Sequence, residues 1–199
     1  MAHVCVVSMR LFLCRPMPSR RLRSNGVDAV MTDVPKVCVS VSTADCIPIL
    51  IYDRVHHAVA AVHAGWRSTV LRISEAVLQA MAGAYGTRPQ DVEAAIGPGI
   101  SLEAFEVGDE VYEAFRTAGF PMEEMARRYP ATGDGSGRME KWHLDLWQAN
   151  RDLLEGCGVP SARIRMAGVC TYLHSERFFS ARRLGIRSGR ILNGIFLTD

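Results

Sequence analysis

The chain of 199 residues is 48% hydrophobic and 22% charged, and its formal net charge is +2. That composition is typical of one folded domain with a sizeable core and argues against wholesale disorder. The small net charge gives no reason to expect a nucleic-acid partner. No hydrophobic run reaches the length of a membrane helix, so we expect no membrane partner either.

The start of the chain differs from the rest, because its first 27 residues hold five arginines and no acidic residue. An arginine-rich, acid-free start is typical of organelle transit peptides, although a truncated or disordered start is the simpler interpretation. We expect residues 1–25 to be such a leader and residues 26–199 to form a single domain. The six cysteines include no C-x-x-C pair, which indicates reduced thiols and a cytoplasmic protein.

Short hydrophobic runs and helical spacings alternate along the remaining sequence. Runs over 36–42, 47–52 and 57–64 are hydrophobic at nearly every position, which predicts strands covered on both faces, as in a layered α/β protein. Helices are predicted after Gly65 and over 108–119 and 144–158. Further strands are predicted over 92–97, 163–168 and 190–197, and turn residues make 129–141 a predicted loop.

Cys46 and His63 stand at the two ends of a run that a turn at 53–56 would fold into a hairpin. A turn centred between Arg54 and Val55 sets Cys46 directly opposite His63 on one sheet face. A thiolate and an imidazole at that separation can share a zinc ion, or the imidazole can take the thiol proton as in a nucleophile–base pair. Alternatively, both residues are ordinary parts of a buried core. A register shift of one residue would place them on opposite faces.

Trp66 and Arg67 follow in the segment HAGWRST, where the predicted strand meets the predicted helix. Free N–H groups at a helix start attract anions, and a guanidinium beside them can bind phosphate or carboxylate. The indole of Trp66 offers a face for stacking on a flat ring. Together with Cys46 and His63, these residues outline a small-molecule site.

The segments TADCIPILIYD, AAVHAGWRST, AAIGPGIS, LDLWQAN and FFSARRLGIRSGR resemble the laccase-domain family of YfiH-like proteins, over about residues 26–197. Members have been described as polyphenol oxidoreductases and as zinc-dependent purine nucleoside phosphorylases with adenosine deaminase activity. The resemblance implies a mixed α/β fold, a single layered α/β/β/α domain of the YfiH-like type. It also implies a metal bound by one cysteine and two histidines, of which Cys46 and His63 match two. The third belongs to an upstream Q-x-H segment that this sequence lacks, and His3 is the histidine that could replace it.

The resemblance also places the segment FFSARRLGIRSGR beside the pocket, so Arg182 and Arg183 are candidates for binding substrate or phosphate. Cys170 is expected near the site for the same reason. Asp45 is expected to form a structural hydrogen bond, and to accept a proton only if the backbone turns there. The remaining histidines are expected in turns, near a helix start or beside the arginines: His56, His57, His143 and His174.

The leading prediction is a zinc-dependent purine nucleoside phosphorylase, a transferase, with adenosine deamination, a hydrolase reaction, at the same site. Copper-dependent polyphenol oxidation is a second hypothesis. A multicopper cluster needs many imidazoles, and this chain has six histidines and no H-x-H pair, although copper(II) binds most Cys/His sites strongly. A third hypothesis is a metal-free Cys/His hydrolase acting on cell-wall precursors, and a fourth is a non-catalytic binding module. The oligomeric state stays open.

Overall fold

The structure is a computed structural model that describes residues 4–8, 13–17, 27–131 and 139–198. Seven strands form a large sheet in the order β11-β7-β5-β6-β3-β1-β2. Neighbouring strands are antiparallel except β11 and β7, which run parallel. The strands are β1 (Val4–Ser8), β2 (Leu13–Met17), β3 (Ala29–Thr32), β5 (Ile47–Asp53), β6 (Ala58–Ala64), β7 (Val92–Ile96) and β11 (Ile164–Met166).

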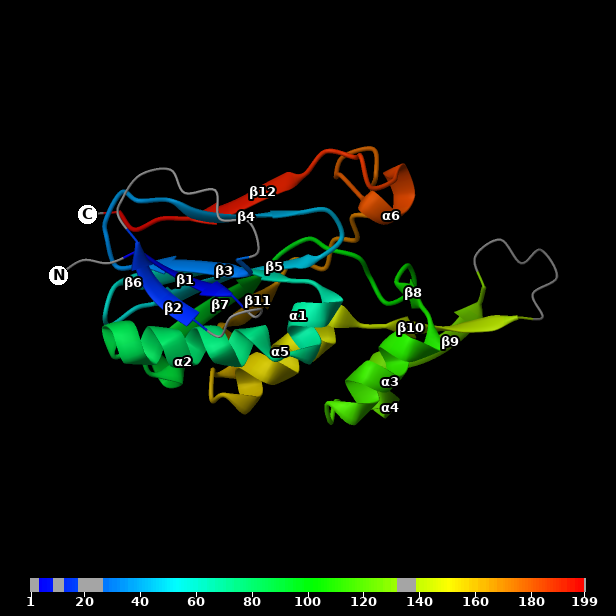
Figure 1. The fold of residues 1–199 in the computed structure, drawn as a ribbon, viewed down its shortest axis with the longest axis horizontal. Coiled ribbons are helices and arrows are strands. Elements are labelled where there is room, and N and C mark those ends of the chain that lie inside the picture. The colour runs from blue at the N-terminus through cyan, green and yellow to red at the C-terminus, as the bar shows by residue number, and fades with distance from the viewer. Residues whose placement is uncertain (1–3, 9–12, 18–26, 132–138, 199) are drawn as a thin grey trace.

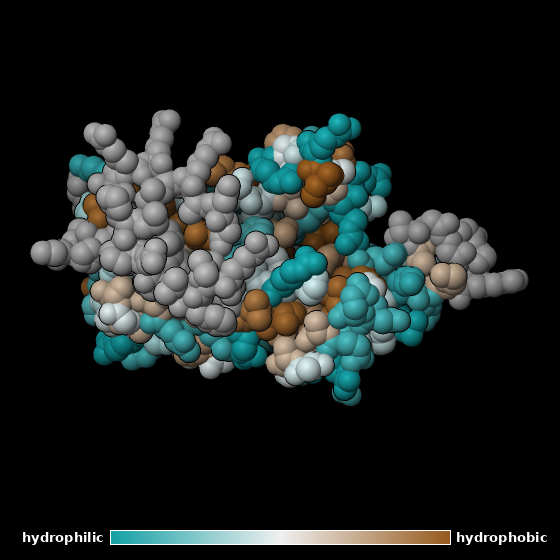
Figure 2. Space-filling model, viewed as in Figure 1, coloured by the Kyte–Doolittle hydropathy of each residue, from teal (hydrophilic) through white to brown (hydrophobic). Residues whose placement is uncertain are grey.

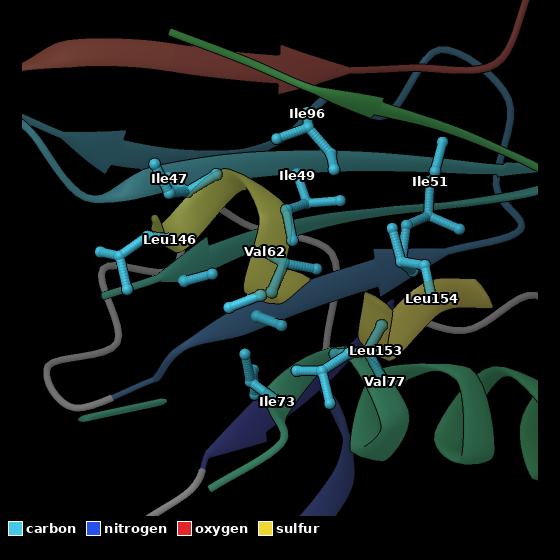
Figure 3. Packing of buried hydrophobic residues seen from close by; sticks show 14 of the residues in the cluster. Ile47, Ile49, Ile51, Val62, Ile73, Val77, Ile96, Leu146, Leu153 and Leu154 are labelled. Carbon is cyan, nitrogen blue, oxygen red and sulfur yellow. The ribbon is translucent and has the colours of Figure 1, made fainter. Parts of the chain in front are cut away.

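Three helices cover one face of this sheet (Figure 1). They are α1 (Trp66–Val70), α2 (Ile73–Tyr85) and α5 (Leu146–Gly156). Arg72 has a left-handed backbone with φ of 61° and divides the predicted long helix into α1 and α2. Isoleucines at alternate positions of β5 point to these helices and pack with α2 and α5 (Figure 3). This layer forms the larger hydrophobic core.

A two-stranded sheet of β4 (Val39–Thr43) and β12 (Ile191–Ile195) packs on the other face of the large sheet (Figure 1). The second core cluster lies between the two sheets and is formed by Val39, Val41, Val59, Ala61 and Leu197. Because β5 and β6 are buried on both faces, their near-continuous hydrophobic sequence is explained. The predicted mixed α/β fold is confirmed.

A smaller unit extends from one end of the large sheet (Figure 1). It contains β8 (Glu106–Val107), β10 (Glu140–Leu144) and β9 (Ala126–Pro130), with α3 (Asp109–Thr117) and α4 (Met122–Met125). The predicted loop over 129–141 is therefore wrong at its two ends, which belong to a β9–β10 hairpin. Single-turn elements complete the fold: η1 (Pro89–Asp91), η2 (Ser161–Arg163) and α6 (Ala181–Leu184).

Two segments of the predicted leader, Val4–Ser8 and Leu13–Met17, pair with each other, and the first also pairs with β3 in the large sheet. These segments are therefore part of the fold, while the division into leader and domain stays a prediction. Cys38, Cys46, Cys157 and Cys170 are free cysteines. Among the described residues no helix is both long and hydrophobic enough to cross a membrane.

The buried carboxylate of Asp53 holds the far end of the β5–β6 hairpin. Its Oδ1 accepts hydrogen bonds from the amides of Val55 and His56 at 2.9 and 3.0 Å, and its Oδ2 lies 2.9 Å from His56 Nδ1. Burial raises the pKa of Asp53, but interactions with the Thr87 side chain and with Val55 and His56 outweigh burial and lower it below its usual value. The turn is thus stabilised by an ionised acid.

We expect Asp53→Asn to lower the free energy of unfolding at pH 7 by about 1–3 kcal/mol. The folded-state pKa is depressed, so the carboxylate's contribution is fully present above about pH 4 and is lost as the pH falls through the folded-state pKa. Urea unfolding of both proteins at pH 7 and about pH 2.5 measures the difference, which should shrink in acid. If the difference in free energy of unfolding at about pH 2.5 were as large as at pH 7, this account of the turn would be contradicted.

Candidate functional site at the start of the β5–β6 hairpin

The register of the hairpin differs from the predicted one. His63 lies opposite Pro48, and Ala64 lies opposite Ile47. The turn between the strands consists of the four residues 54–57, whereas the predicted turn had two residues at its centre. In the observed register Cys46, which comes directly before β5, is opposite Gly65. The prediction that Cys46 faces His63 directly is therefore wrong by two positions. Because side chains alternate with period two, a shift of two keeps both residues on the same face.

Cys46 and His63 nevertheless both lie next to Gly65. A Cβ at Gly65 would lie 3.1 Å from Sγ of Cys46 and 3.6 Å from Cε1 of His63. The sulfur and the imidazole thus border one small space that a side chain at position 65 would fill. The glycine directly before the tryptophan in HAGW is the sequence signal for this small space. The prediction of the site did not use it.

Ser68 fixes the junction where β6 passes into α1. Its hydroxyl donates to the carbonyl of His63 at 3.1 Å and to that of Gly65 at 3.2 Å. The amide of His63 donates to the carbonyl of Asp28 at 2.7 Å. These contacts hold the backbone of His63 on both sides and so restrict the direction of its imidazole.

Burial keeps both candidate ligands in their neutral forms. Burial raises the pKa of the Cys46 thiol to about 11; the charge of Asp45 adds to this, and the charge of Arg190 opposes it. Burial also lowers the pKa of His63, against the charge of Asp28. Near neutral pH the thiol is therefore protonated and the imidazole has a free lone pair, the form in which histidine binds metal.

Trp66 and Arg67 begin α1 beside this space. The guanidinium carbon of Arg67 lies 4.2 Å from the centre of the Trp66 ring, so one face of the indole is covered by its neighbour. Arg67 is exposed, and stacking on a ring leaves the in-plane N–H groups of a guanidinium available to an anion. α1 has only five residues, so its dipole is small and Arg67 is the stronger anion-binding candidate.

Asp45 forms the structural hydrogen bonds that were expected, and the backbone also turns there, with φ of 85°. Its Oδ1 accepts from Thr171 Oγ1 and its Oδ2 accepts from the amide of Arg182, both at 2.7 Å. The carboxylate thereby joins the residue before Cys46 to the start of α6. Sequence analysis missed Thr171, which lies 126 positions away.

Arg182 and Arg183 are engaged with the protein. Arg182 Nη1 donates to the carbonyl of Glu106 at 2.8 Å, and its guanidinium lies over the Phe105 ring. Arg183 Nη1 donates to the Tyr172 hydroxyl at 3.3 Å. Each retains further N–H groups, so their role toward substrate stays a prediction.

Cys170 lies close to the segment that carries the site. Its sulfur accepts from the amide of Ser101 at 3.3 Å, and it bridges to Gly99. A Cβ at Gly99 would lie 3.0 Å from the carbonyl oxygen of Asp45 and would overlap Ile47. Cys170 is buried and acts here as a packing residue.

The remaining described histidines lie in other parts of the fold. His56 and His57 are in the β5–β6 turn, with contacts to Asp53 and Tyr52. His143 is buried in β10 and contacts the carbonyl of Leu102, and exposed His174 lies 3.6 Å from Glu176. His3 lies outside the described residues.

The donor types of Cys46 and His63 fit a zinc ion, which prefers thiolate and imidazole, and both border the position that a side chain at Gly65 would occupy. Within the part of the chain that the structure describes, no group of three or more Cys, His, Asp or Glu residues is arranged to hold a metal. Metal binding by Cys46 and His63 therefore stays a prediction.

Comparison with known proteins extends over nearly the whole chain. The family model described as multi-copper polyphenol oxidoreductase laccase matches residues 3–198. A purine nucleoside phosphorylase of Bacteroides thetaiotaomicron is 50% identical over 186 residues, which cover 94% of this chain and 66% of that protein. The adenosine deaminase RL5 of an unknown prokaryotic organism is 42% identical over 98% of this chain and 72% of its own length.

Solved structures agree with the sequence relatives. The crystal structure of the hypothetical protein YfiH from Bacillus licheniformis matches with a TM-score of 0.76 and 31% identity, covering 86% of this chain and 61% of that one. The chain thus spans between 61% and 72% of the length of these three relatives. It belongs to the multi-copper polyphenol oxidoreductase laccase family, which includes YfiH-like proteins, as the resemblance implied.

Proposed function

We propose that this chain carries a purine nucleoside phosphorylase site that uses zinc bound by Cys46 and His63. The observation that carries the proposal is the position left free by Gly65. A Cβ placed there would lie 3.1 Å from Sγ of Cys46 and 3.6 Å from Cε1 of His63. Relatives named purine nucleoside phosphorylase, including one 50% identical, support the substrate class.

In phosphorolysis an oxygen of phosphate attacks the ribose carbon that bears the base. The carbon–nitrogen bond breaks, and its electron pair and a proton go to the departing purine. Arg67 would hold the phosphate, because its guanidinium is exposed and restrained by stacking on Trp66. The half-buried Trp66 would contribute hydrophobic surface to the nucleoside pocket.

Cys46 and His63 would hold the zinc ion, with His3 or another group outside the described residues as a third ligand. When bound, zinc supplies a Lewis acid and makes water acidic enough to act as a nucleophile near neutral pH. That chemistry suits displacement of the 6-amino group of adenosine by water, with release of ammonia. The relative named adenosine deaminase supports this second reaction.

Copper-dependent oxidation and metal-free hydrolysis fit the site less well. The family description favours phenol oxidation by copper, but six histidines without an H-x-H pair cannot supply the paired imidazoles of a multicopper cluster. A metal-free hydrolase would need a Cys46 thiolate, and burial raises the pKa of that thiol to about 11. A zinc ion also binds the thiolate, but its positive charge would stabilise that form and lower the pKa of the thiol, a help that a metal-free site lacks.

The direct test is hypoxanthine release from inosine and phosphate by zinc-loaded protein. We expect Cys46→Ala to lower the rate at least about hundredfold, because one of the two described ligands is removed. Cys38→Ala is the matched control, since Cys38 is an exposed free cysteine just before β4, and it should keep the wild-type rate.

Inosine left intact by the wild-type protein, or release that survives Cys46→Ala, would contradict the proposed function. Oxygen uptake with a phenol as substrate, measured on the same preparations, distinguishes copper-dependent oxidation.

A further inference from the structure

Asp45 is buried and stands directly before Cys46, and its carboxylate is held by distant parts of the chain. Both of its oxygens are used by other parts of the chain, Thr171 and the amide of Arg182. Its own carbonyl accepts from the amide of Ile100 at 2.8 Å. Residue 45 therefore joins three segments that are far apart in the sequence.

The backbone at Asp45 is held in a conformation that most residues avoid. Its φ of 85° lies in the left-handed region, which asparagine and aspartate tolerate better than other residues with a side chain. The turn ends the β4 segment and sets the direction in which Cys46 leaves. The close approach of Gly99 to the carbonyl of Asp45 secures the same turn from the other side.

The other end of this network is the segment that carries α6. Ser180 caps α6 by accepting from the amide of Arg183, and the amide before it, that of Arg182, is bound by Asp45. Exposed hydrophobic side chains gather on the surface near α6 (Figure 2), among them Leu184 and Ile186. With so little of this segment buried, we expect its position to depend strongly on the Asp45 contact.

We propose that Asp45 is a positioning residue for the Cys46–His63 site, and that its two hydrogen bonds set the direction of Cys46 and hold the α6 segment beside it. Asp45 acts through these neighbours and does not exchange a proton with substrate. The inference extends the proposed function and rests on it for its catalytic consequence, but its geometry can be tested without substrate or metal.

The experiment compares Asp45→Ala with Asp45→Asn. Both substitutions remove the carboxylate charge, so a difference between them reports on geometry alone. Asparagine can accept from the amide of Arg182 through its oxygen and donate to Thr171 through its nitrogen, whereas alanine can do neither.

Alkylation of Cys46 by iodoacetamide is followed in metal-free protein by peptide mass spectrometry, and tryptic cleavage after Arg182 and Arg183 is followed in parallel. We expect Cys46 to react about tenfold faster in Asp45→Ala than in Asp45→Asn, with a similar increase in cleavage of the α6 segment. Asp53→Asn, which loses a buried carboxylate at the opposite end of β5, is the matched control and should leave both rates within about twofold of wild type. Equal rates in Asp45→Ala and Asp45→Asn would overturn the proposal.

Hypoxanthine release separates this inference from the proposed function. We expect kcat to fall about tenfold in Asp45→Ala, with KM within about threefold, and Asp45→Asn to retain most of the rate, as for loss of a group that orients a ligand. If asparagine abolishes the rate as fully as alanine, the charge or a proton of Asp45 is required and the positioning role is wrong. If the wild type releases no hypoxanthine, the proposed function fails, and the alkylation and cleavage rates alone decide the role of Asp45.

Discussion

Gly65→Ala is expected to lower hypoxanthine release about hundredfold and to weaken zinc binding while leaving the fold intact. The added methyl would lie 3.1 Å from the sulfur of Cys46 and 3.6 Å from the imidazole of His63. It would fill the space that the two side chains border. The backbone of Gly65, with φ of −76° and ψ of 170°, is one that alanine adopts without strain. The substitution therefore acts on the site alone.

The matched control is Gly83→Ala in α2. A Cβ at Gly83 would have no neighbouring atom within 4 Å, and replacing a helix glycine by alanine stabilises by about 1 kcal/mol. Gly83→Ala should keep full activity with slightly higher thermal stability. Wild-type activity in Gly65→Ala would show that the space between Cys46 and His63 is not used.

Ile49→Ala is expected to cause the largest loss of stability, about 2–5 kcal/mol. Ile49 is fully buried at the centre of β5, on the face that packs against α2 and α5 (Figure 3). Its removal leaves a cavity between sheet and helices that these rigid elements cannot close. Urea unfolding followed by far-ultraviolet circular dichroism measures the change.

Leu192→Ala is the control for this prediction, because Leu192 in β12 is 73% exposed. Its effect should stay within about 0.5 kcal/mol. A loss below about 1 kcal/mol for Ile49→Ala would mean that the core between β5 and the helices is loosely packed.

Much of the fold could be predicted from the sequence because hydrophobic periodicity is local. The continuous runs of β5 and β6 and the helical spacing of α2 and α5 each indicate an element without knowledge of the rest. The same signals fail for β9 and β10, whose polar sequences form a hairpin next to a segment rich in turn residues. The helix α6 could not be predicted, because four residues are too few to show a helical spacing, and one of its amides is bound by Asp45, 137 positions away.

The site was predictable in its residues but not in its register. The spacing of Cys46 and His63 indicated a hairpin, yet the four-residue turn depends on Asp53, whose buried hydrogen bonds to residues 55 and 56 fix its length. Cys46 and His63 still lie on the same face, because the observed register differs from the predicted one by an even number of residues. The role of Gly65 could not be deduced from a pattern of side chains, because it contributes none.

The measurement that tests the central claim most directly is cobalt binding by the metal-free protein, with absorbance as the readout. Cobalt replaces zinc at mixed sulfur and nitrogen sites, and its bond to a thiolate gives a charge-transfer band in the near ultraviolet. We expect the band in the wild-type chain, its loss in Cys46→Ala, and an affinity about 10–100-fold lower in His63→Ala. A band that persists without Cys46, or an affinity unchanged without His63, would show that the thiol and the imidazole do not hold one ion together.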